Sequence, residues 1–186
     1  CKSVRVTGVT IDYAPPLYIQ GRGAAAAGKA VDLEVSPGFP VSDKTRPDKV
    51  LYFKPDGSFI PHRMEFPDHT ELLGGRKIRV HTKYGWITQD PYRQFGGLEI
   101  GDYVAIEGRL GGSLSSVECE GMRFEALTFY GGPGFCIHER DGAGGNSYRN
   151  CRIIRMPGTG RLLAANADTF HSYNMQRGPL IESCEF

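Results

Sequence analysis

The 186-residue sequence has no long apolar run and almost no surplus of either charge. No stretch approaches the roughly 20 apolar residues that a membrane-spanning helix needs, so we expect no membrane span. Lys and Arg number 22 against 21 Asp and Glu, whereas neutralising the phosphates of a nucleic acid requires a basic surplus. We therefore expect neither nucleic acid nor an anionic membrane as the partner.

Spacings typical of zinc, redox or phosphate sites are also missing. The five cysteines include no CxxC pair, which argues against zinc and redox motifs. The glycine-rich run 131–134 lacks the Lys and Ser or Thr of a phosphate-binding loop. His62, His69 and His81 have no regular ligand spacing. We interpret these histidines as loop residues and expect no metal and no cofactor.

Glycine and proline are abundant instead, with 25 and 12 residues, as in chains of many short strands joined by turns. Three C-terminal segments, 124–129, 148–153 and 180–186, each end in an apolar–polar–apolar triplet. Such alternation is typical of strands with one buried face. Their last residues lie 24 and 33 positions apart, within the range of solenoid repeats. We predict an all-β fold with consecutive coils of a right-handed parallel β-helix.

The N-terminal segment, residues 1–13, has the same alternation, and its triplet Val9-Thr10-Ile11 is similar to Leu127-Thr128-Phe129. The intervening stretch is far too long for a loop of a compact coil. It contains several short alternating segments separated by turn signals, which favour a small barrel or sandwich. We therefore predict a first β-helix coil at 1–13, an inserted antiparallel β-barrel or sandwich domain at 14–120, and further coils at 121–186.

Cys151 and Cys184 occupy equivalent places in the similar segments. Equivalent places stack in a solenoid, so we interpret the two as buried free thiols that pack as small apolar groups. A disulfide between neighbouring coils is the alternative. Tyr84, Trp86 and Tyr92 form an aromatic group in the predicted insert. These rings either pack in a core or offer a platform on which a sugar stacks.

The densest polar cluster runs from Asn166 to Asn174. In a strand, Asn166 and Asp168 share one face and His171 lies on the other. This set of side chains suits sugar hydroxyls, and Asp168 could act as a general acid or base. The alternative is an Asn/Asp-rich turn.

A second polar cluster contains His138 and Glu139. Stacking of neighbouring coils would place either residue beside Asp168. The alternative for this cluster is a solvated run of charges. Asp12, a third acid, is interpreted as a turn former at the end of a strand.

Two segments carry a resemblance to a known family. Residues 6–21, VTGVTIDYAPPLYIQG, resemble the segment that leads into the inserted barrel of the α-1,3-galactosidase family of parallel-β-helix glycoside hydrolases. Residues 167–186, ADTFHSYNMQRGPLIESCEF, resemble a coil of the same family and are the more specific match. The resemblance covers both ends of the chain and implies an insertion between them.

This resemblance implies an inverting, metal-free exo-α-galactosidase that acts on glycans ending in α-1,3-linked galactose, with the parent protein extracellular or periplasmic. Asp168 matches the first of three active-site aspartates. The remaining site residues, expected to hold sugar hydroxyls or to orient Asp168, are His171, Asn166, Arg177, His138 and Glu139.

The other two aspartates of the family would follow Phe186, in a longer parent protein. Inverting hydrolysis needs two carboxyl groups about 6.5–9.5 Å apart, so we expect the chain as given to be catalytically inactive. Two alternatives stay open. One is a carbohydrate-binding or adhesion β-helix without hydrolysis. The other is a polysaccharide lyase, which the single aspartate and few basic residues of this coil disfavour.

Overall fold

The computed structural model describes residues 1–27, 30–42, 49–65, 67–82, 99–108 and 111–186. These residues form strands and turns, and none of them is helical, which confirms the expected all-β class. The chain makes two compact units. Unit 1 consists of Cys1–Ala14 with Leu110–Phe186, and unit 2 consists of Pro15–Arg109. The boundaries of the inserted domain thus fall after residues 14 and 109, whereas the sequence predicted them after residues 13 and 120.

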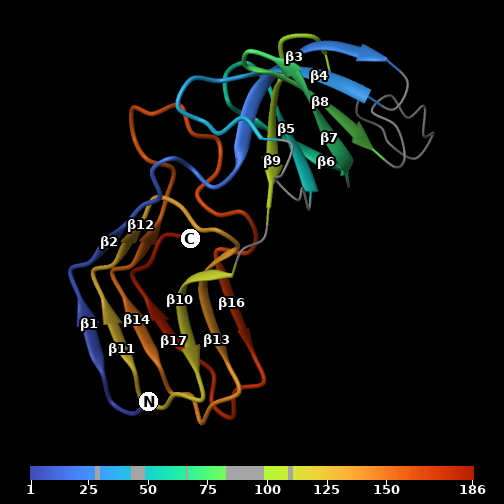
Figure 1. Cartoon of the computed structure of the whole chain (residues 1–186). Coiled ribbons are helices and arrows are strands. Elements are labelled where there is room, and N and C mark those ends of the chain that lie inside the picture. The colour runs from blue at the N-terminus through green and yellow to red at the C-terminus, as the bar shows by residue number, and fades with distance from the viewer. Residues whose placement is uncertain (28–29, 43–48, 66, 83–98, 109–110) are drawn as a thin grey trace. The chain divides into compact units, whose positions relative to one another are not determined.

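The strands described in unit 1 pair only in parallel (Figure 1). They form three sheets, with strand orders β1-β11-β14-β17, β10-β13-β16 and β15-β12-β2. The chain visits the three sheets in turn, and we call each round of three strands a passage. One passage supplies β11, β12 and β13, and the next supplies β14, β15 and β16 to the same three sheets. The strands are β1 (Arg5–Thr7), β2 (Thr10–Ile11), β10 (Gly112–Val117), β11 (Arg123–Glu125), β12 (Thr128–Phe129), β13 (Phe135–Arg140), β14 (Ser147–Arg149), β15 (Arg152–Ile153), β16 (Phe170–Tyr173) and β17 (Leu180–Glu182).

The registers of these sheets follow the similarities in the sequence. Phe129 pairs with Ile11 on one side and with Ile153 on the other, so equivalent triplets lie in adjacent strands. Cys151 and Cys184 are also neighbours, since the backbone N–H of Cys151 donates to Sγ of Cys184 at 3.3 Å. Both cysteines are free thiols, which favours the thiol interpretation over the disulfide.

Apolar side chains from all three sheets fill the interior of unit 1. Phe124 of β11 stacks on Tyr148 of β14, with ring centroids 4.9 Å apart. Phe129 of β12 and Ile137 of β13 are fully buried in the same cluster. Because each passage of the chain supplies one such residue per strand, neighbouring passages share a continuous core.

One residue with a left-handed backbone follows each strand of the β1-β11-β14-β17 sheet. These residues have φ values between 53° and 69°, a region that glycine adopts freely and asparagine tolerates. The backbone N–H of Ala126 is held by the carbonyl of Arg149 in the next passage, at 2.9 Å. The bend is therefore imposed by the neighbouring strand, even where an alanine or a serine occupies it. The four residues are Gly8, Ala126, Asn150 and Ser183.

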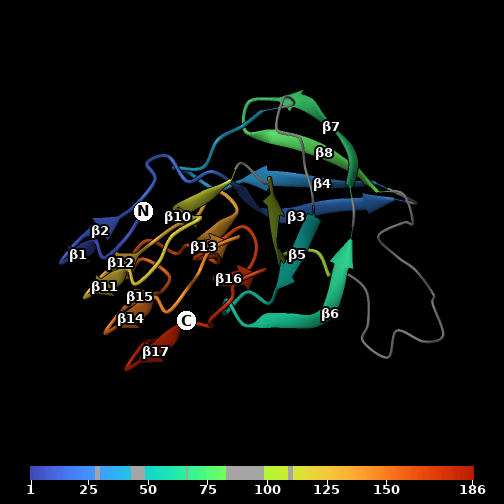
Figure 2. The same cartoon turned by 90° about the horizontal axis from the view of Figure 1, so that it is seen from below.

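Unit 2 is a single antiparallel sheet with the strand order β6-β5-β9-β3-β4-β8-β7 (Figure 2). No pairing joins β6 to β7 in the described residues, so the sheet is open. The predicted domain was a barrel or a sandwich, and the closed barrel is wrong for this part of the chain. The strands are β3 (Ile19–Ala27), β4 (Ala30–Val35), β5 (Lys49–Phe53), β6 (Phe59–Glu65), β7 (Pro67–Gly74), β8 (Lys77–Thr82) and β9 (Tyr103–Glu107).

The three histidines expected in loops lie in strands instead: His62 in β6, His69 in β7 and His81 in β8. The loop interpretation failed because ligand spacing was judged along the chain, whereas antiparallel pairing sets His69 directly opposite His81. The aromatic group of Tyr84 and Trp86, with Tyr92, falls outside the described residues.

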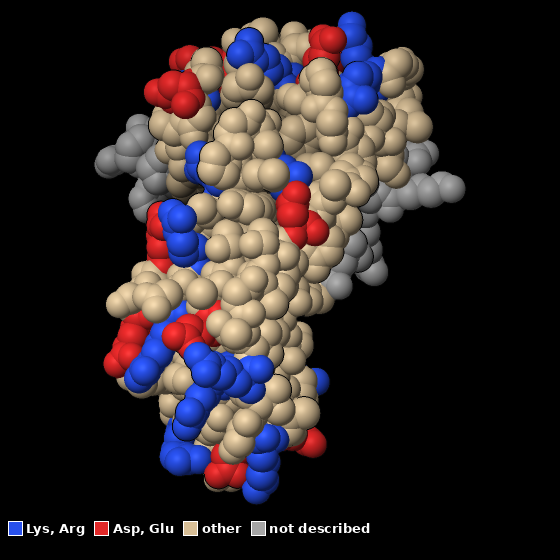
Figure 3. Space-filling view, turned by 90° about the vertical axis from the view of Figure 1, so that its left-hand side faces the viewer, with Lys and Arg blue, Asp and Glu red and all other residues tan. Residues whose placement is uncertain are grey.

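The surface of unit 1 carries charges of both signs. Figure 3 shows basic and acidic side chains interspersed on the face in view. Neighbouring strands pair them, as with Arg5 and Glu125 at 2.5 Å and Arg149 and Glu182 at 2.7 Å. Within the described ranges, no helix is long and apolar enough to cross a membrane.

Candidate functional site

Asp168 and His171 form a hydrogen-bonded pair at the start of β16. The carboxylate Oδ2 of Asp168 lies 2.7 Å from Nδ1 of His171. Their side chains are 59% and 37% exposed, so both reach solvent. The expectation that they occupy opposite strand faces is wrong, because Asp168 lies in a bent, irregular segment and β16 begins only at Phe170.

Three further rings surround His171 on the outer side of the β10-β13-β16 sheet. Phe135 stacks on His171, with centroids 4.5 Å apart and an interplanar angle of 16°. His138 pairs with His171 in the β13–β16 register, and their ring centroids are 5.7 Å apart. Tyr173 stacks on His138 at 5.6 Å. We call Phe135, His138, His171 and Tyr173 the ring cluster.

His138 is the most enclosed polar ring of the cluster. Its Nε2 atom is buried and has no hydrogen-bond partner in the part of the chain that the structure describes. Burial, reinforced by the charges of His171 and Arg140, lowers the pKa of His138 below its usual value near 6.5. A neutral imidazole is therefore favoured at neutral pH, and this ring adds contact area rather than charge.

Glu139 does not reach this surface. It alternates with His138 along β13, so its side chain points inward and is fully buried. Its carboxylate accepts hydrogen bonds from Asn146 Nδ2 at 2.9 Å, Tyr148 Oη at 3.0 Å and Ser172 Oγ at 2.7 Å. Glu139 is thus bound by three side chains of its own chain, and the alternative of a solvated charge run is also wrong at this position.

Asn166 and Arg177 are likewise not brought to Asp168. Asn166 is 2% exposed, and its backbone N–H donates to the carbonyl of Gly132 at 3.1 Å. Arg177 follows the far end of β16, so the four-residue strand separates it from Asp168 by roughly 13 Å. Its guanidinium donates to Oε1 of Glu120 at 3.1 Å.

Sequence reasoning missed Phe135 and Tyr173 as members of the site. Tyr173 stands two residues after His171, so strand alternation would have placed both on one face. Phe135 is found only through the β13–β16 register. The outward-facing positions of β10, β13 and β16 at the shared register are Ser115, His138, His171, Val117, Arg140 and Tyr173. None of these six residues is an acid. Asp168 lies just before β16, and Asp141, whose charge acts on His138, directly follows β13.

Asp12 pairs with Arg161, whose side chain is 9% exposed. Burial alone would raise the pKa of Asp12, but the hydrogen bonds and charge of Arg161 outweigh it and hold the pKa below its usual value. Arg161 also donates to the backbone carbonyls of Tyr13 and Tyr130. Asp12 therefore joins segments of unit 1, in agreement with a structural role.

In the described residues, one group combines side chains that commonly hold metal ions, namely His69, Glu71 and His81 of unit 2. It shares no residue with the Asp168–His171 site. Comparison with models of known protein families and with curated proteins finds no match to this chain.

Proposed function

We propose that unit 1 is a section of a parallel β-helix whose β10-β13-β16 face holds the terminal α-linked galactose of a glycan, within a parent α-galactosidase of the inverting type. The observation that carries this proposal is the solvent-exposed Asp168–His171 pair beside the ring cluster. The resemblance of residues 167–186 to a coil of the α-1,3-galactosidase family supports the same assignment.

Parallel-only pairing supports the β-helix part of the proposal. Each passage of the chain contributes one strand to each of three sheets, and adjacent passages share one core. This is the arrangement expected of solenoid coils, which bury their apolar face only by stacking on neighbours. A parallel β-helix also places side chains from successive coils in one row, as with His138 and His171.

The chemistry of the pair suits a sugar ligand. Asp168 can accept hydrogen bonds from two sugar hydroxyls, and His171 holds its carboxylate in one orientation. Rings such as Tyr173 present apolar faces, and a ligand site that combines such faces with a few placed polar groups is the usual design for a small molecule. In the complete enzyme, Asp168 would serve as the general base or as part of the base pair.

Hydrolysis requires a second carboxyl group about 6.5–9.5 Å from the first. The outward register positions of β10, β13 and β16 supply none. We therefore propose that this chain binds the sugar but does not hydrolyse its glycosidic bond. A non-catalytic carbohydrate-binding role for the whole protein is the second candidate, and the lack of an acid at these register positions favours it.

Binding is tested by titrating the 186-residue chain with methyl α-galactoside and, as the epimer control, methyl α-glucoside, followed by NMR. We expect shift changes confined to the ring cluster and its neighbours, with galactoside preferred. Asp168→Asn should weaken binding at least tenfold, because a charge-assisted hydrogen bond contributes about 1.5–3 kcal/mol and about 1.4 kcal/mol corresponds to a factor of ten. Asp56→Asn, an exposed acid in unit 2, is the matched control. Equal binding of both sugars, or no effect of Asp168→Asn, contradicts the proposal.

Hydrolysis is tested on the full parent protein with a terminal α-1,3-galactoside. Release of galactose by the wild type, and its loss in Asp168→Asn even at concentrations of galactoside that saturate the variant, supports the enzyme. Binding without release of galactose supports the second candidate. A parent protein that neither binds nor cleaves the galactoside rules out both.

A further inference from the structure

The antiparallel β7–β8 pair of unit 2 brings together side chains that are well apart in the sequence. His69 lies opposite His81 and Glu71 opposite Arg79 in the register of the two strands. Because side chains alternate between faces along a strand, His69 and Glu71 project to the same face, and His81 and Arg79 project with them. Two imidazoles and one carboxylate therefore meet on one side of the sheet.

The distances within this group are close to those of a metal site. The rings of His69 and His81 stack, with centroids 4.2 Å apart, and Nε2 of His81 lies 3.5 Å from Oε2 of Glu71. One ligand atom from each of the three residues lies within 4.8 Å of the others. Metal–ligand bonds near 2.0–2.1 Å put tetrahedral ligands about 3.4 Å apart. Small side-chain rotations at exposed His69 and Glu71 cover the difference.

Asp68 orients one of these imidazoles for binding. Its Oδ2 lies 3.1 Å from Nδ1 of His69, so Nδ1 carries the proton when it donates to that carboxylate. The lone pair of His69 then resides on Nε2. A carboxylate behind a histidine is the usual support for a metal-ligating ring, where it fixes the tautomer and raises the basicity of the ligand.

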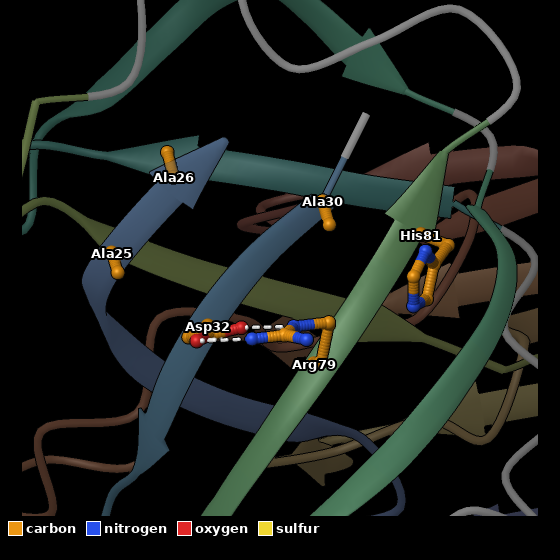
Figure 4. Close-up of a pocket in the computed structure, with 6 residues that line it drawn as sticks. All are labelled: Ala25, Ala26, Ala30, Asp32, Arg79 and His81. Carbon is orange, nitrogen blue, oxygen red and sulfur yellow. Dashed lines mark hydrogen bonds and ion pairs between the residues drawn. The ribbon is translucent and has the colours of Figure 1, made fainter. Parts of the chain in front are cut away.

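The other two members are not committed to competing partners. Nε2 of His81 is buried and makes no hydrogen bond in the described part of the chain. Arg79, which faces Glu71 across the strands, donates instead to both carboxylate oxygens of Asp32, at 2.7 and 3.0 Å. Figure 4 shows Arg79 engaged with Asp32. Since the guanidinium is held there, the Glu71 carboxylate is available to a cation.

A pocket of about 300 Å³ adjoins the group on the side of His81. Its remaining walls are small or paired side chains, which leave room for solvent beside the imidazole (Figure 4). Three protein ligands leave a fourth tetrahedral position, which a water molecule fills in zinc sites of this type. The pocket is lined by Ala25, Ala26, Ala30, Asp32, Arg79 and His81.

We propose that His69, Glu71 and His81 bind a divalent first-row transition-metal ion, Zn²⁺ above all, with Asp68 as the supporting carboxylate. Two imidazole nitrogens and one carboxylate oxygen suit Zn²⁺ better than Mg²⁺ or Ca²⁺, which prefer oxygen ligands. The site lies in unit 2 and does not depend on the sugar site of unit 1.

The test is a calorimetric titration of the 186-residue chain with Zn²⁺, carried out in a Cys1→Ser background so that the exposed thiol does not compete. We expect saturable binding of one ion per chain. His69→Ala and His81→Ala should each weaken the affinity at least tenfold, and Asp68→Asn about tenfold. Glu34→Gln removes an exposed carboxylate from β4 of the same sheet, and this control should change the affinity less than twofold.

A second measurement keeps the test valid if a variant folds poorly. Paramagnetic Co²⁺ added to the Cys1→Ser chain should broaden the ring-proton NMR signals of His69 and His81 before those of His138 and His171. Mg²⁺ at the same concentration should leave all four unchanged. The proposal is overturned by the absence of saturable Zn²⁺ binding, by unchanged affinity in both histidine variants, or by Co²⁺ broadening that begins at His138 or His171.

Discussion

The hydroxyl of Tyr148 is expected to contribute strongly to the stability of unit 1 through the buried Glu139. Tyr148 is fully buried and donates to the Glu139 carboxylate at 3.0 Å. Burial, together with the negative charge of Glu139, raises the pKa of Tyr148, so the hydroxyl keeps its proton and donates. Tyr148→Phe removes this donor while the ring stays packed against Phe124 and Phe170.

The size of the effect follows from what the carboxylate loses. A hydrogen bond to a charged acceptor contributes about 1.5–3 kcal/mol, and a buried acceptor gains no water in exchange. Asn146 and Ser172 still donate to Glu139 in the variant, which favours the lower half of that range. We therefore expect a loss of about 2 kcal/mol, which corresponds to a fall in Tm of about 4–8 °C for a chain of this length.

Urea denaturation followed by fluorescence and far-UV circular dichroism measures the loss. Tyr130→Phe is the control, since that hydroxyl makes no hydrogen bond to the described residues. A double-mutant cycle with Glu139→Gln then isolates the pairwise interaction. A loss below about 0.5 kcal/mol in Tyr148→Phe, or no coupling in the cycle, would show that Glu139 does not depend on this donor.

Two further predictions concern the left-handed residues that follow the strands of unit 1 and its free thiols. Ala126→Gly should raise the free energy of unfolding by about 0.5–1 kcal/mol, because the φ of 53° strains an exposed alanine; an unchanged urea midpoint would contradict this. Burial raises the pKa of Cys136 to about 12, so a disulfide reagent at pH 8 should modify exposed Cys1 rapidly and Cys136 only upon unfolding. Equal rates of modification in the native chain would refute this account.

The sequence predicted the elements of unit 1 well where alternation was regular. The similarity of Val9-Thr10-Ile11 to Leu127-Thr128-Phe129 corresponds to the observed pairing of Thr10 with Thr128 and of Ile11 with Phe129. This worked because equivalent side chains fill equivalent places in one core. Strand β10 was not recognised, because its sequence GSLSSV offers little apolar alternation and its pairing with β13 supplies the order.

The site was predicted less well, for two physical reasons. Asp168 was placed on a strand face, but the chain bends before β16 and turns the carboxylate toward His171. Glu139 was taken as a surface charge because its burial depends on donors from Asn146 and Tyr148, which belong to the next passage of the chain. Alternation along β13 alone does not reveal these donors, because Asn146 and Tyr148 reach Glu139 across a turn and Ser172 lies 33 residues away. Nothing in the sequence indicated that His69 and His81 form one group, because only the register of the β7–β8 hairpin brings them together.

The pairing of Ile19 with Ile106 has a consequence for the order of folding. It places the two ends of unit 2 side by side, and the segments that flank them must meet before β1 can pair with β11. If unit 2 folds first, the open loop between β1 and β11 becomes about fourfold shorter, which lowers the entropic cost of closing it by about 1 kcal/mol. Folded unit 2 then holds its two flanking segments together and so brings β1 close to its partner β11. If unit 2 folds slowly, β1 of one chain can instead pair with β11 of another chain, and this exchange is the competing outcome.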